Sequence, residues 1–396
     1  MSDQNQTDFS TRAIRTEIPP SKHREQSSAL YLNSGYRFDD SEHSRQLFAE
    51  ERVDHVYSRY TNPNVLEFVQ KMCALEKMDQ GFATSTGMSA IFLSLVSLLN
   101  AGDHVVACRS LFGSSHQLFT QVLPRFQISH TYVDANKPET WEKEIKKETK
   151  MLFFETPSNP GLDLIDLEWA INLGHKHNLW VNIDNTFASP VIQNPGVLGA
   201  DVVTHSATKF IDGQGRAMGG IALFKNKDAS KFVFTARHTG PVISPFNAWL
   251  FSKSLETLDL RVEKHSQNAL QLATFLEAHK EEVLWVKYPH LPSHPQYTIA
   301  KKQMRLGGGI VTFALKGGMS RAKKFVDSLK MLNITANLGD TRSLITHPAL
   351  TTHSRLTPED RLKVNITDDL LRVSVGLENL ADVQQDITQA MHASKG

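Results

Sequence analysis

The sequence predicts an α/β protein with a mostly parallel central sheet, an N-terminal arm and a smaller α+β C-terminal domain. Between residues 82 and 224, short continuous apolar segments alternate with helical patterns, as in a parallel sheet that is covered on both faces. Polar clusters directly follow three of these segments, and ligands of such sheets bind beyond the carboxyl ends of the strands. We therefore expect a binding site at one edge of the sheet.

The composition narrows the class of protein. The 396 residues are 40% hydrophobic and 21% charged, which is enough for a large core and typical of two domains. The net charge is +1, so no strong field indicates a nucleic acid or a membrane as partner. The N-terminus has no signal-peptide pattern and the longest apolar segment, 90–99, is too short to span a bilayer. We expect a cytoplasmic enzyme whose two cysteines, Cys73 and Cys108, are buried free thiols.

The chain divides into three predicted parts: an arm at 1–62, an α/β domain at 63–255 and an α+β domain at 256–396. The arm is polar, contains few apolar residues and is interrupted by two prolines, so it must pack on something else, for which a neighbouring subunit is a natural candidate. Segment 56–63, at the end of the arm, brings two phenols and a guanidinium together just before a turn. Tyr57 and Arg59 are interpreted equally well as functional residues or as an ordinary surface pair.

Each element is predicted from its pattern of apolar residues. Strands are expected at 105–108, 128–133, 151–155, 179–183, 201–204 and 221–224, and later at 309–315 and 371–374. Helices are expected after residue 63, after 85, at 115–122, at 165–178 and, as one long stretch, from 244 to about 276. This alternation is the basis of the predicted parallel sheet.

The polar clusters at the strand ends are 156–160, 184–187 and 206–209. In the last cluster Ser206 and Thr208 stand beside Lys209, a set that suits a ligand carrying both a phosphate and an aldehyde, such as pyridoxal phosphate (PLP). A solvated surface lysine is the alternative for this cluster taken alone.

Small and hydroxyl residues at 83–89 open a helix, which indicates either an anion site or simple helix capping. The glycine loop at 213–216 lacks the dinucleotide fingerprint, so a nicotinamide cofactor is disfavoured.

Two features of the C-terminal part indicate a substrate site. Arg372 lies inside a predicted strand, where its charge needs a partner and would suit a carboxylate. An outward-facing arginine on an edge strand is the equal alternative. The polar loop 337–344 is set in apolar sequence and lies before that strand.

Seven segments, in order, make the chain resemble the Cys/Met-metabolism family of PLP enzymes. They are YSRYTNPN, ATSTGMSA, FETPSNP, VNIDNTFASP, THSATKFIDGQGR, NLGDTRSLITHPA and LLRVSVGLEN, which together reach from Tyr57 to Asn379. The resemblance implies the aspartate-aminotransferase-like fold of type I and a homotetramer whose active sites are shared between two subunits. No metal site is implied.

The resemblance also implies roles for residues of this chain. Lys209 would bind the cofactor covalently and then move protons, because a desolvated lysine has a lowered pKa. Asp184 would pair with the pyridine nitrogen and keep it protonated. The phosphate would be held by Ser85, Gly87, Met88, Ser206 and Thr208, with Tyr57 and Arg59 from a neighbouring subunit. The ring would be contacted by Asn159 and Thr186, and the substrate carboxylate would be bound by Arg372, by the backbone near Ser343 and also by Asn159.

Two departures from the family pattern concern the substrate. Phe112 stands where much of the family has a ring-stacking tyrosine, so it can stack but cannot act as acid or base. A mechanism that needs a phenol there would have to take it from Tyr57 or do without. Arg342 stands where cystathionine-handling members carry a glutamate, which disfavours cysteine and suits an anionic substrate. The chain thus looks most like the O-succinylhomoserine sulfhydrylase branch, in which sulfide replaces succinate to give homocysteine. O-acetylhomoserine sulfhydrylase, cystathionine γ-synthase and methionine γ-lyase are the alternatives.

Overall fold

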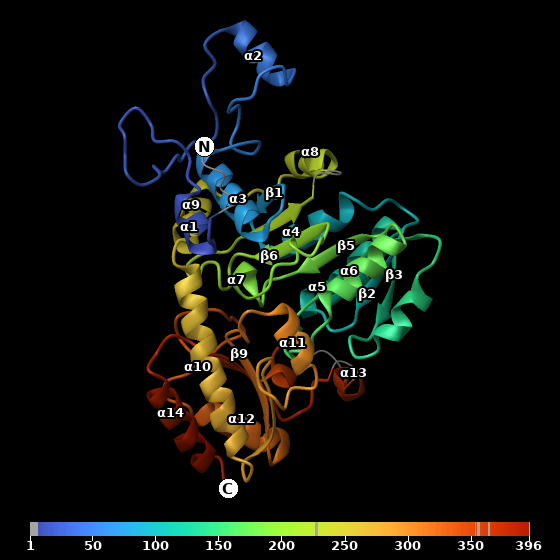
Figure 1. Ribbon diagram of the computed structural model, residues 1–396, viewed down its shortest axis with the longest axis vertical. Coiled ribbons are helices and arrows are strands. Elements are labelled where there is room, and N and C mark those ends of the chain that lie inside the picture. The colour runs from blue at the N-terminus through green and yellow to red at the C-terminus, as the bar shows by residue number, and fades with distance from the viewer. Residues whose placement is uncertain (1–6, 226–228, 353, 355–356, 363–364, 396) are drawn as a thin grey trace.

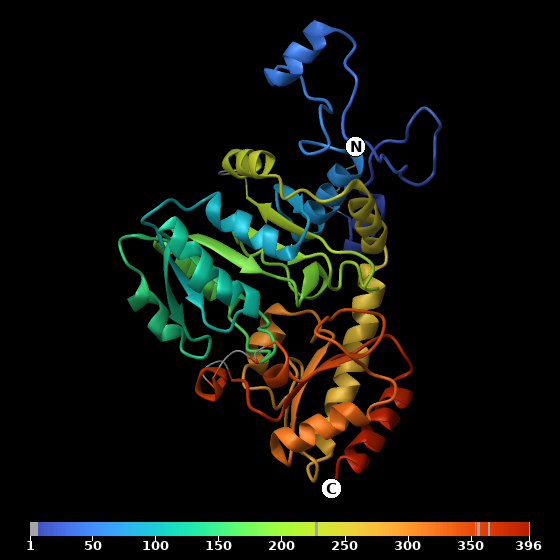
Figure 2. The same ribbon diagram turned by 180° about the vertical axis from the view of Figure 1, so that it is seen from behind.

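The computed structural model describes residues 7–225, 229–352, 354, 357–362 and 365–395. Figure 1 shows a larger upper body and a smaller lower body, with the N-terminal arm projecting from the top. The yellow helix α10 (Leu258–Ala278) runs from one body into the other, and the view from behind shows the same arrangement (Figure 2). The upper body holds a seven-stranded sheet and the lower body a five-stranded sheet. The predicted α/β fold with a smaller α+β part is confirmed.

The arm contains two short helices, α1 (Phe9–Arg15) and α2 (Ser41–Phe48). Asp40 caps α2 by accepting a hydrogen bond from the His43 N–H at 2.7 Å. Several large apolar side chains of the arm, including Leu32, Phe48 and Val53, are more than half exposed. In Figure 1 the helix α2 stands apart from the upper body, whereas α1 lies beside α9 and contributes Ala13 to the upper core.

The large sheet is parallel apart from one strand. Its strands are β1 (Gln80–Thr84), β2 (His104–Cys108), β3 (Ser129–Val133), β4 (Thr149–Glu155), β5 (Trp180–Asp184), β6 (Val202–Ser206) and β7 (Gly220–Phe224), in the order β1-β7-β6-β5-β4-β2-β3. Only β7 runs antiparallel to its neighbours, β1 and β6. The reason is that a loop, rather than a crossover helix, joins β6 to β7.

Both faces of this sheet are buried, as the continuous apolar strands predict. Along β4, Met151 and Phe153 belong to one apolar cluster and Leu152 and Phe154 to another, because alternate side chains point to opposite faces. The covering helices are α3 (Pro63–Glu76), α4 (Gly87–Val96), α5 (Gly113–Gln117), α6 (Leu167–Lys176), α7 (Ser189–Ile192), α8 (Ala229–Thr239) and α9 (Pro245–Leu255). Short π and 3₁₀ turns span Leu118–Val122, Leu123–Phe126 and Pro138–Glu144.

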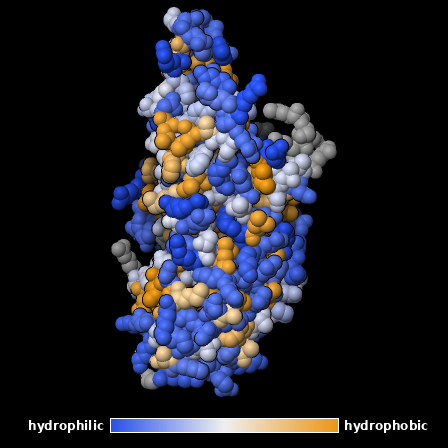
Figure 3. All heavy atoms as spheres, turned by 90° about the vertical axis from the view of Figure 1, so that its left-hand side faces the viewer, coloured by the Kyte–Doolittle hydropathy of each residue, from blue (hydrophilic) through white to orange (hydrophobic). Residues whose placement is uncertain are grey.

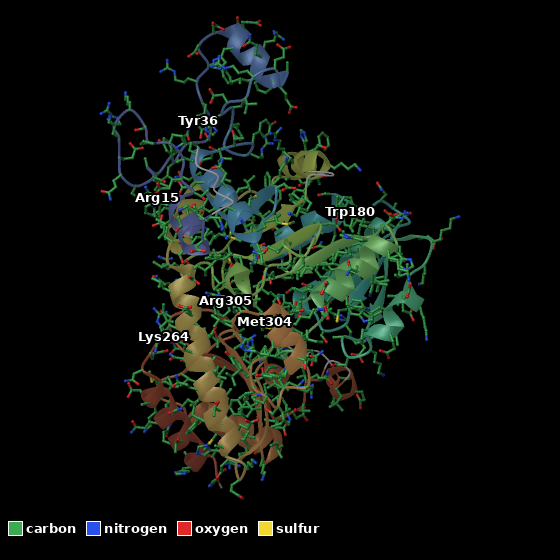
Figure 4. All side chains as sticks on the ribbon, viewed as in Figure 1. Arg15, Tyr36, Trp180, Lys264, Met304 and Arg305 are labelled. Carbon is green, nitrogen blue, oxygen red and sulfur yellow. The ribbon has the colours of Figure 1, made fainter. Side chains whose placement is uncertain are left out.

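The lower body packs helices against a mostly antiparallel sheet. Its strands are β8 (Val283–Lys287), β9 (Ile310–Leu315), β10 (Asn333–Ile334), β11 (Leu344–Thr346) and β12 (Leu370–Ser374), in the order β10-β11-β12-β9-β8. Its helices are α11 (Tyr297–Gln303), α12 (Gly318–Ser328), α13 (Pro358–Leu362) and α14 (Leu380–Ala393), with a 3₁₀ turn at Pro348–Leu350. Figure 4 shows Arg305 beside α10, where its guanidinium pairs with Asp259. The predicted domain limits at 62 and 255 stay predictions.

The long helix predicted from 244 to about 276 is instead two helices, α9 and α10. The break falls at Glu256 and Thr257, where Thr257 has the non-helical dihedrals φ −116° and ψ 9°. The carbonyl of Ser254 accepts a bond from Arg261 Nη2 at 2.8 Å and a tight-turn bond from the Thr257 N–H at 3.3 Å. These bonds replace the regular helical one, so the chain turns at a point that apolar periodicity does not mark.

The site is positioned by the carboxyl ends of the central strands. Glu155 is the register partner of Asp184, and Asp184 is the register partner of Thr204, so the ends of β4, β5 and β6 lie side by side. The three predicted polar clusters therefore meet at one edge, above the lower body. Among the described residues, no helix is long and apolar enough to cross a membrane.

Candidate active site

A cavity of about 380 Å³ lies at this edge of the sheet. Residues from both bodies line it, because the loop before β11 reaches up from the lower body. The lining residues are Thr86, Gly87, Met88, Ile91, Phe112, Glu155, Pro157, Asn159, Asp184, Thr186, Phe187, Ser206, Thr208, Lys209, Met218, Ala336, Asn337, Leu338 and Thr352. Nine residues predicted for the upper-body site are among them: Gly87, Met88, Phe112, Asn159, Asp184, Thr186, Ser206, Thr208 and Lys209.

Lys209 extends from the turn that follows β6 into this cavity. Its Nζ donates a hydrogen bond to Asn337 Oδ1 at 2.8 Å. Burial, and secondly the positive charge of Arg372, lower the pKa of Lys209 to about 8. The amine is therefore available in its neutral, nucleophilic form near physiological pH, unlike a solvated lysine.

Asp184 lies at the end of β5, and one of its carboxylate oxygens is already engaged. Its Oδ1 accepts the Thr186 N–H at 3.0 Å and the Thr186 hydroxyl at 2.5 Å. Burial raises the pKa of Asp184, and the bonds from Thr186 partly offset this. Among the described residues, none donates a hydrogen bond to Oδ2. A ring N–H cation at that oxygen would compensate the buried charge.

The start of α4 forms one wall of the cavity. Thr86 caps the helix by accepting the Ser89 N–H at 3.1 Å, and the first N–H groups of a helix have no partner within it. Gly87 lies so close to β6 that a Cβ there would be 2.6 Å from the Cβ of Ser206. This close approach brings the free N–H groups of the helix and the Ser206 side chain to the same place. The arrangement is that of an anion cradle.

Phe112 and Asn159 lie at the cavity in two different loops. The N–H of Phe112 donates to Glu155 Oε2 and the N–H of Asn159 donates to Glu155 Oε1, each at 2.9 Å. The side-chain Oδ1 of Asn159 accepts a bond from Arg372 Nη1, also at 2.9 Å. Sequence reasoning did not assign Glu155 to the site. The signal was present, since an acidic residue ends the apolar run of β4.

Arg372 is buried rather than outward-facing, with 2% of its surface exposed. Its Nη2 donates to the carbonyls of Ala336 and Asn337 at 3.1 and 3.0 Å. Its Nε is buried, and no described residue accepts a bond from it. Burial lowers the pKa of Arg372 to about 10, so the guanidinium stays charged at neutral pH. A buried cation with an unused donor, close to Lys209, suits a substrate carboxylate.

Arg372 is not among the residues that line the cavity, and neither are Ser343 and Arg342, which are also predicted to bind substrate. Ser343 is fully buried, and its N–H and hydroxyl both donate to the carboxylate of Glu378, at 2.6 and 2.9 Å. The Arg342 side chain is 63% exposed and pairs with Asp340 at 3.2 Å. Roles of Ser343 and Arg342 in substrate binding stay predictions.

Tyr57 and Arg59 also lie away from the cavity of their own chain. They are on the arm, where the Arg59 guanidinium lies over the rings of Tyr57 and Tyr60 and donates to the carbonyl of Arg237 at 2.6 Å. Ser85 is exposed at the end of β1, and its N–H donates to Pro241 O at 2.9 Å. A role for Tyr57 and Arg59 at a neighbouring subunit's site stays a prediction, as does a phosphate contact by Ser85.

Comparisons with known proteins agree with this geometry. The model of the Cys/Met metabolism PLP-dependent enzymes matches residues 10–392. The chain belongs to this family. It is 44% identical over 385 residues to an O-succinylhomoserine sulfhydrylase of Pseudomonas aeruginosa, a match covering 97% of this chain and 95% of the relative. It is 38% identical to an L-methionine gamma-lyase of Treponema denticola, with 97% and 96% coverage.

A solved structure of the same family shows the cofactor attached to a lysine. A putative O-acetylhomoserine (thiol)-lyase from Campylobacter jejuni carries a pyridoxyl-lysine monophosphate and matches this chain with a TM-score of 0.93. The two chains are 31% identical over 98% of this chain and 100% of the other. As a member of this PLP-dependent family, the chain is an enzyme that uses PLP.

The residues of the cavity fit PLP as a cofactor. The lowered pKa of Lys209 suits bonding to an aldehyde, the free Oδ2 of Asp184 suits a ring N–H cation, and the cradle at Gly87 suits a phosphate. Asn337, whose side chain holds the lysine amine, is a further site residue that sequence reasoning noted only as part of a polar loop. Its signal was that loop itself, a polar segment between apolar stretches.

Proposed function

We propose that this enzyme catalyses a γ-replacement in which O-succinyl-L-homoserine and sulfide give L-homocysteine and succinate, a step of methionine biosynthesis. The observation that carries the proposal is the buried amine of Lys209, within hydrogen-bond distance of Asn337 and beside Asp184 in one cavity. The name of the P. aeruginosa relative, which matches over nearly the whole chain, supports the choice of ester and nucleophile.

We infer that the cofactor is held by groups on three sides of the cavity. Lys209 would bond to its aldehyde, Asp184 Oδ2 would hold the proton on the ring nitrogen, and the phosphate would be bound by Ser85, Gly87, Met88, Ser206 and Thr208. Phe112 would stack on one face of the ring, and Asn159 and Thr186 would support its edge. When bound, PLP withdraws electrons from the substrate carbons near its aldehyde and so makes their protons acidic.

Lys209 is the residue proposed to move protons. With the substrate bound, its Nζ, whose pKa is lowered to about 8, would accept the proton of Cα, give it up, and only then accept a proton from Cβ, because an amine takes up one proton at a time. Succinate would leave from Cγ with the bonding electron pair, hydrosulfide would add at the same carbon, and Nζ would then return one proton at a time to the substrate carbons. Asn337 Oδ1, 2.8 Å from Nζ, would hold the protonated amine in reach of the substrate.

Arg372 would hold the α-carboxylate of the substrate. Its buried Nε has no acceptor among the described residues, and Nη1 is fixed by Asn159. A carboxylate there would form charge-assisted hydrogen bonds and satisfy the orphaned donor. The backbone near Ser343 would assist.

The choice of ester and nucleophile is proposed to depend on Phe112 and Arg342. Phe112 offers no hydroxyl to the reacting groups, and sulfide needs no pocket of its own. Arg342 is the exposed cation of its loop, so its side chain can leave Asp340 at small cost and meet the succinyl carboxylate. The corresponding glutamate of cystathionine-handling members would repel that carboxylate.

The active site is proposed to be completed by a second subunit in a homotetramer. Tyr57 and Arg59 would reach the neighbour's phosphate site, and Tyr57 would supply the phenol that Phe112 lacks. The arm exposes apolar side chains such as Leu32 and Val53. Figure 3 shows apolar side chains scattered among polar ones on the face that carries α1, α9 and α10, and these helices expose Ile14, Phe246 and Leu260. Contact between copies would cover such residues.

The test is a steady-state comparison of the succinyl and acetyl esters, each with sulfide or cysteine, on the purified holoenzyme. The proposal predicts the largest kcat/KM for the succinyl ester with sulfide, and no activity for Lys209→Ala. A large preference for cysteine, for the acetyl ester or for methionine cleavage would identify another member of the family. A chain without the yellow colour of lysine-bound PLP would refute the assignment of the site.

A further inference from the structure

Glu155 occupies the floor of the cavity between two loops. It ends β4, beside its register partner Asp184, and only 6% of it is exposed. Its two carboxylate oxygens divide between the loops: Oε2 accepts the N–H of Phe112 and Oε1 accepts the N–H of Asn159, each at 2.9 Å. A carboxyl group has two oxygens that can accept, so it matches two backbone donors that approach from different sides.

From Glu155 a chain of hydrogen bonds continues into the lower body. Asn159, whose N–H is held by Glu155, accepts a bond from Arg372 Nη1 at 2.9 Å. Arg372 in turn donates from Nη2 to the carbonyl of Asn337 at 3.0 Å. The position of Glu155 is therefore linked to the guanidinium that would hold the substrate carboxylate.

The same chain ends at the lysine. The Asn337 side chain accepts the bond from Lys209 Nζ at 2.8 Å. Glu155 is thus linked, through two loops and one strand of the lower body, both to Phe112 and to Lys209. Both residues, like Glu155 itself, line the cavity.

A buried carboxyl group beside Asp184 does not favour the stability of the fold. Burial, and secondly the charge of Asp184, raise the pKa of Glu155 to about 8, while the bonds from Phe112 and Asn159 act in the opposite direction. A glutamine carries no charge and would avoid the repulsion from Asp184. It has a single acceptor oxygen, however, so its side-chain NH₂ would face the backbone N–H of one loop, and two donors cannot form a hydrogen bond. The carboxyl group has two acceptor oxygens, one for each loop, and a glutamine in its place would lack one of them.

We propose that Glu155 is a positioning residue: by binding the backbone of both loops, it sets Phe112 and Asn159 in the places where each would contact the cofactor ring. It does not touch the reacting atoms; it acts through Phe112 and Asn159. The inference rests on the proposed assignment of the cavity to PLP.

The test compares Glu155→Gln with Asp386→Asn as a matched control. Asp386 is likewise buried, with 6% exposed, and accepts backbone N–H groups of Lys330 and Met331 at 2.9 and 2.8 Å, but in the lower body. Apoproteins are titrated with PLP, and the visible circular dichroism of the bound cofactor is recorded with the melting temperature. Glu155→Gln leaves one buried backbone N–H without an acceptor, which predicts about 10- to 100-fold weaker cofactor binding and an altered visible band.

Asp386→Asn is expected to melt at a lower temperature while it keeps the affinity and the visible band. Glu155→Gln that behaves in the same way would overturn the proposal. If Glu155→Gln does not fold, Glu155→Asp decides, because it keeps the carboxyl group but is one methylene too short to hold both loops. Unchanged affinity and dichroism in Glu155→Asp would then overturn the proposal. An unmodified chain that binds PLP but rejects the succinyl ester refutes the proposed reaction, and the affinity comparison still decides the role of Glu155.

Discussion

Replacing Gly87 by alanine should weaken cofactor binding through a clash that can be read from the backbone. An added Cβ would lie 2.6 Å from the Cβ and 2.9 Å from the Cα of Ser206. Since carbon atoms prefer about 3.5–4.0 Å, the start of α4 and the end of β6 must separate by roughly 1 Å. These two segments form the anion cradle, so their separation would move the N–H groups of α4 away from the Ser206 side chain and weaken binding of the phosphate.

The expected magnitude follows from the cost of overpacking a well-packed site, about 1–3 kcal/mol. If this cost appears in cofactor binding, the Kd for PLP rises by about 5- to 150-fold. The assay is titration of the apoprotein with PLP, followed by the visible absorbance. Gly113→Ala is the matched control, because Gly113 also begins a helix, yet its added Cβ would meet nothing closer than the Thr352 carbonyl at 3.5 Å. Equal affinities for the two variants would refute the assignment of the cradle to the phosphate.

Three further predictions concern charge and reactivity. The rate at which the apoprotein binds PLP should rise as the pH increases through about 8, because Lys209 loses its proton there. In Arg372→Leu the midpoint of this pH–rate curve should move to higher pH, because the cation that helps to lower the pKa of Lys209 is gone. Asp184→Asn should bind PLP but lose about 10²- to 10³-fold in kcat, measured with the succinyl ester and sulfide, because the ring nitrogen loses its counter-charge. Cys108 is buried as predicted, but Cys73 is only partly buried, because it lies at the edge of the apolar cluster under α3. Desolvation raises the pKa of both thiols to about 12, so neither should react fast with a thiol reagent at pH 8 before the chain unfolds. Fast modification of the native protein would contradict that burial.

The positions of the strand ends could be predicted because they depend on residues that are close together in the sequence. Apolar runs that end in polar residues mark where β5 and β6 stop, and parallel strands bring those ends together, so Asp184 and Lys209 could be paired from sequence. The break between α9 and α10 could not, because it depends on Arg261, a residue four positions beyond Thr257 whose guanidinium captures a carbonyl in the folded state.

The C-terminal side of the site was harder to predict for a similar reason. The sequence allows either a carboxylate site or an exposed edge for Arg372, and only the packing of β12 between β9 and β11 makes it buried. Glu155 is, from sequence, only the end of a strand, because its role is visible only once Phe112 and Asn159, far apart in sequence, donate to it. Contacts between loops carry no periodic signal.

The most direct test of the account is to find which residue carries the cofactor. The purified holoprotein is reduced with borohydride, which makes the bond to the cofactor permanent, and its peptides are mapped by mass spectrometry. If Lys209 binds the cofactor, one phosphopyridoxyl group per chain is expected, on the peptide that contains Lys209. A label on any other lysine, or no label on a chain that is active, would contradict it.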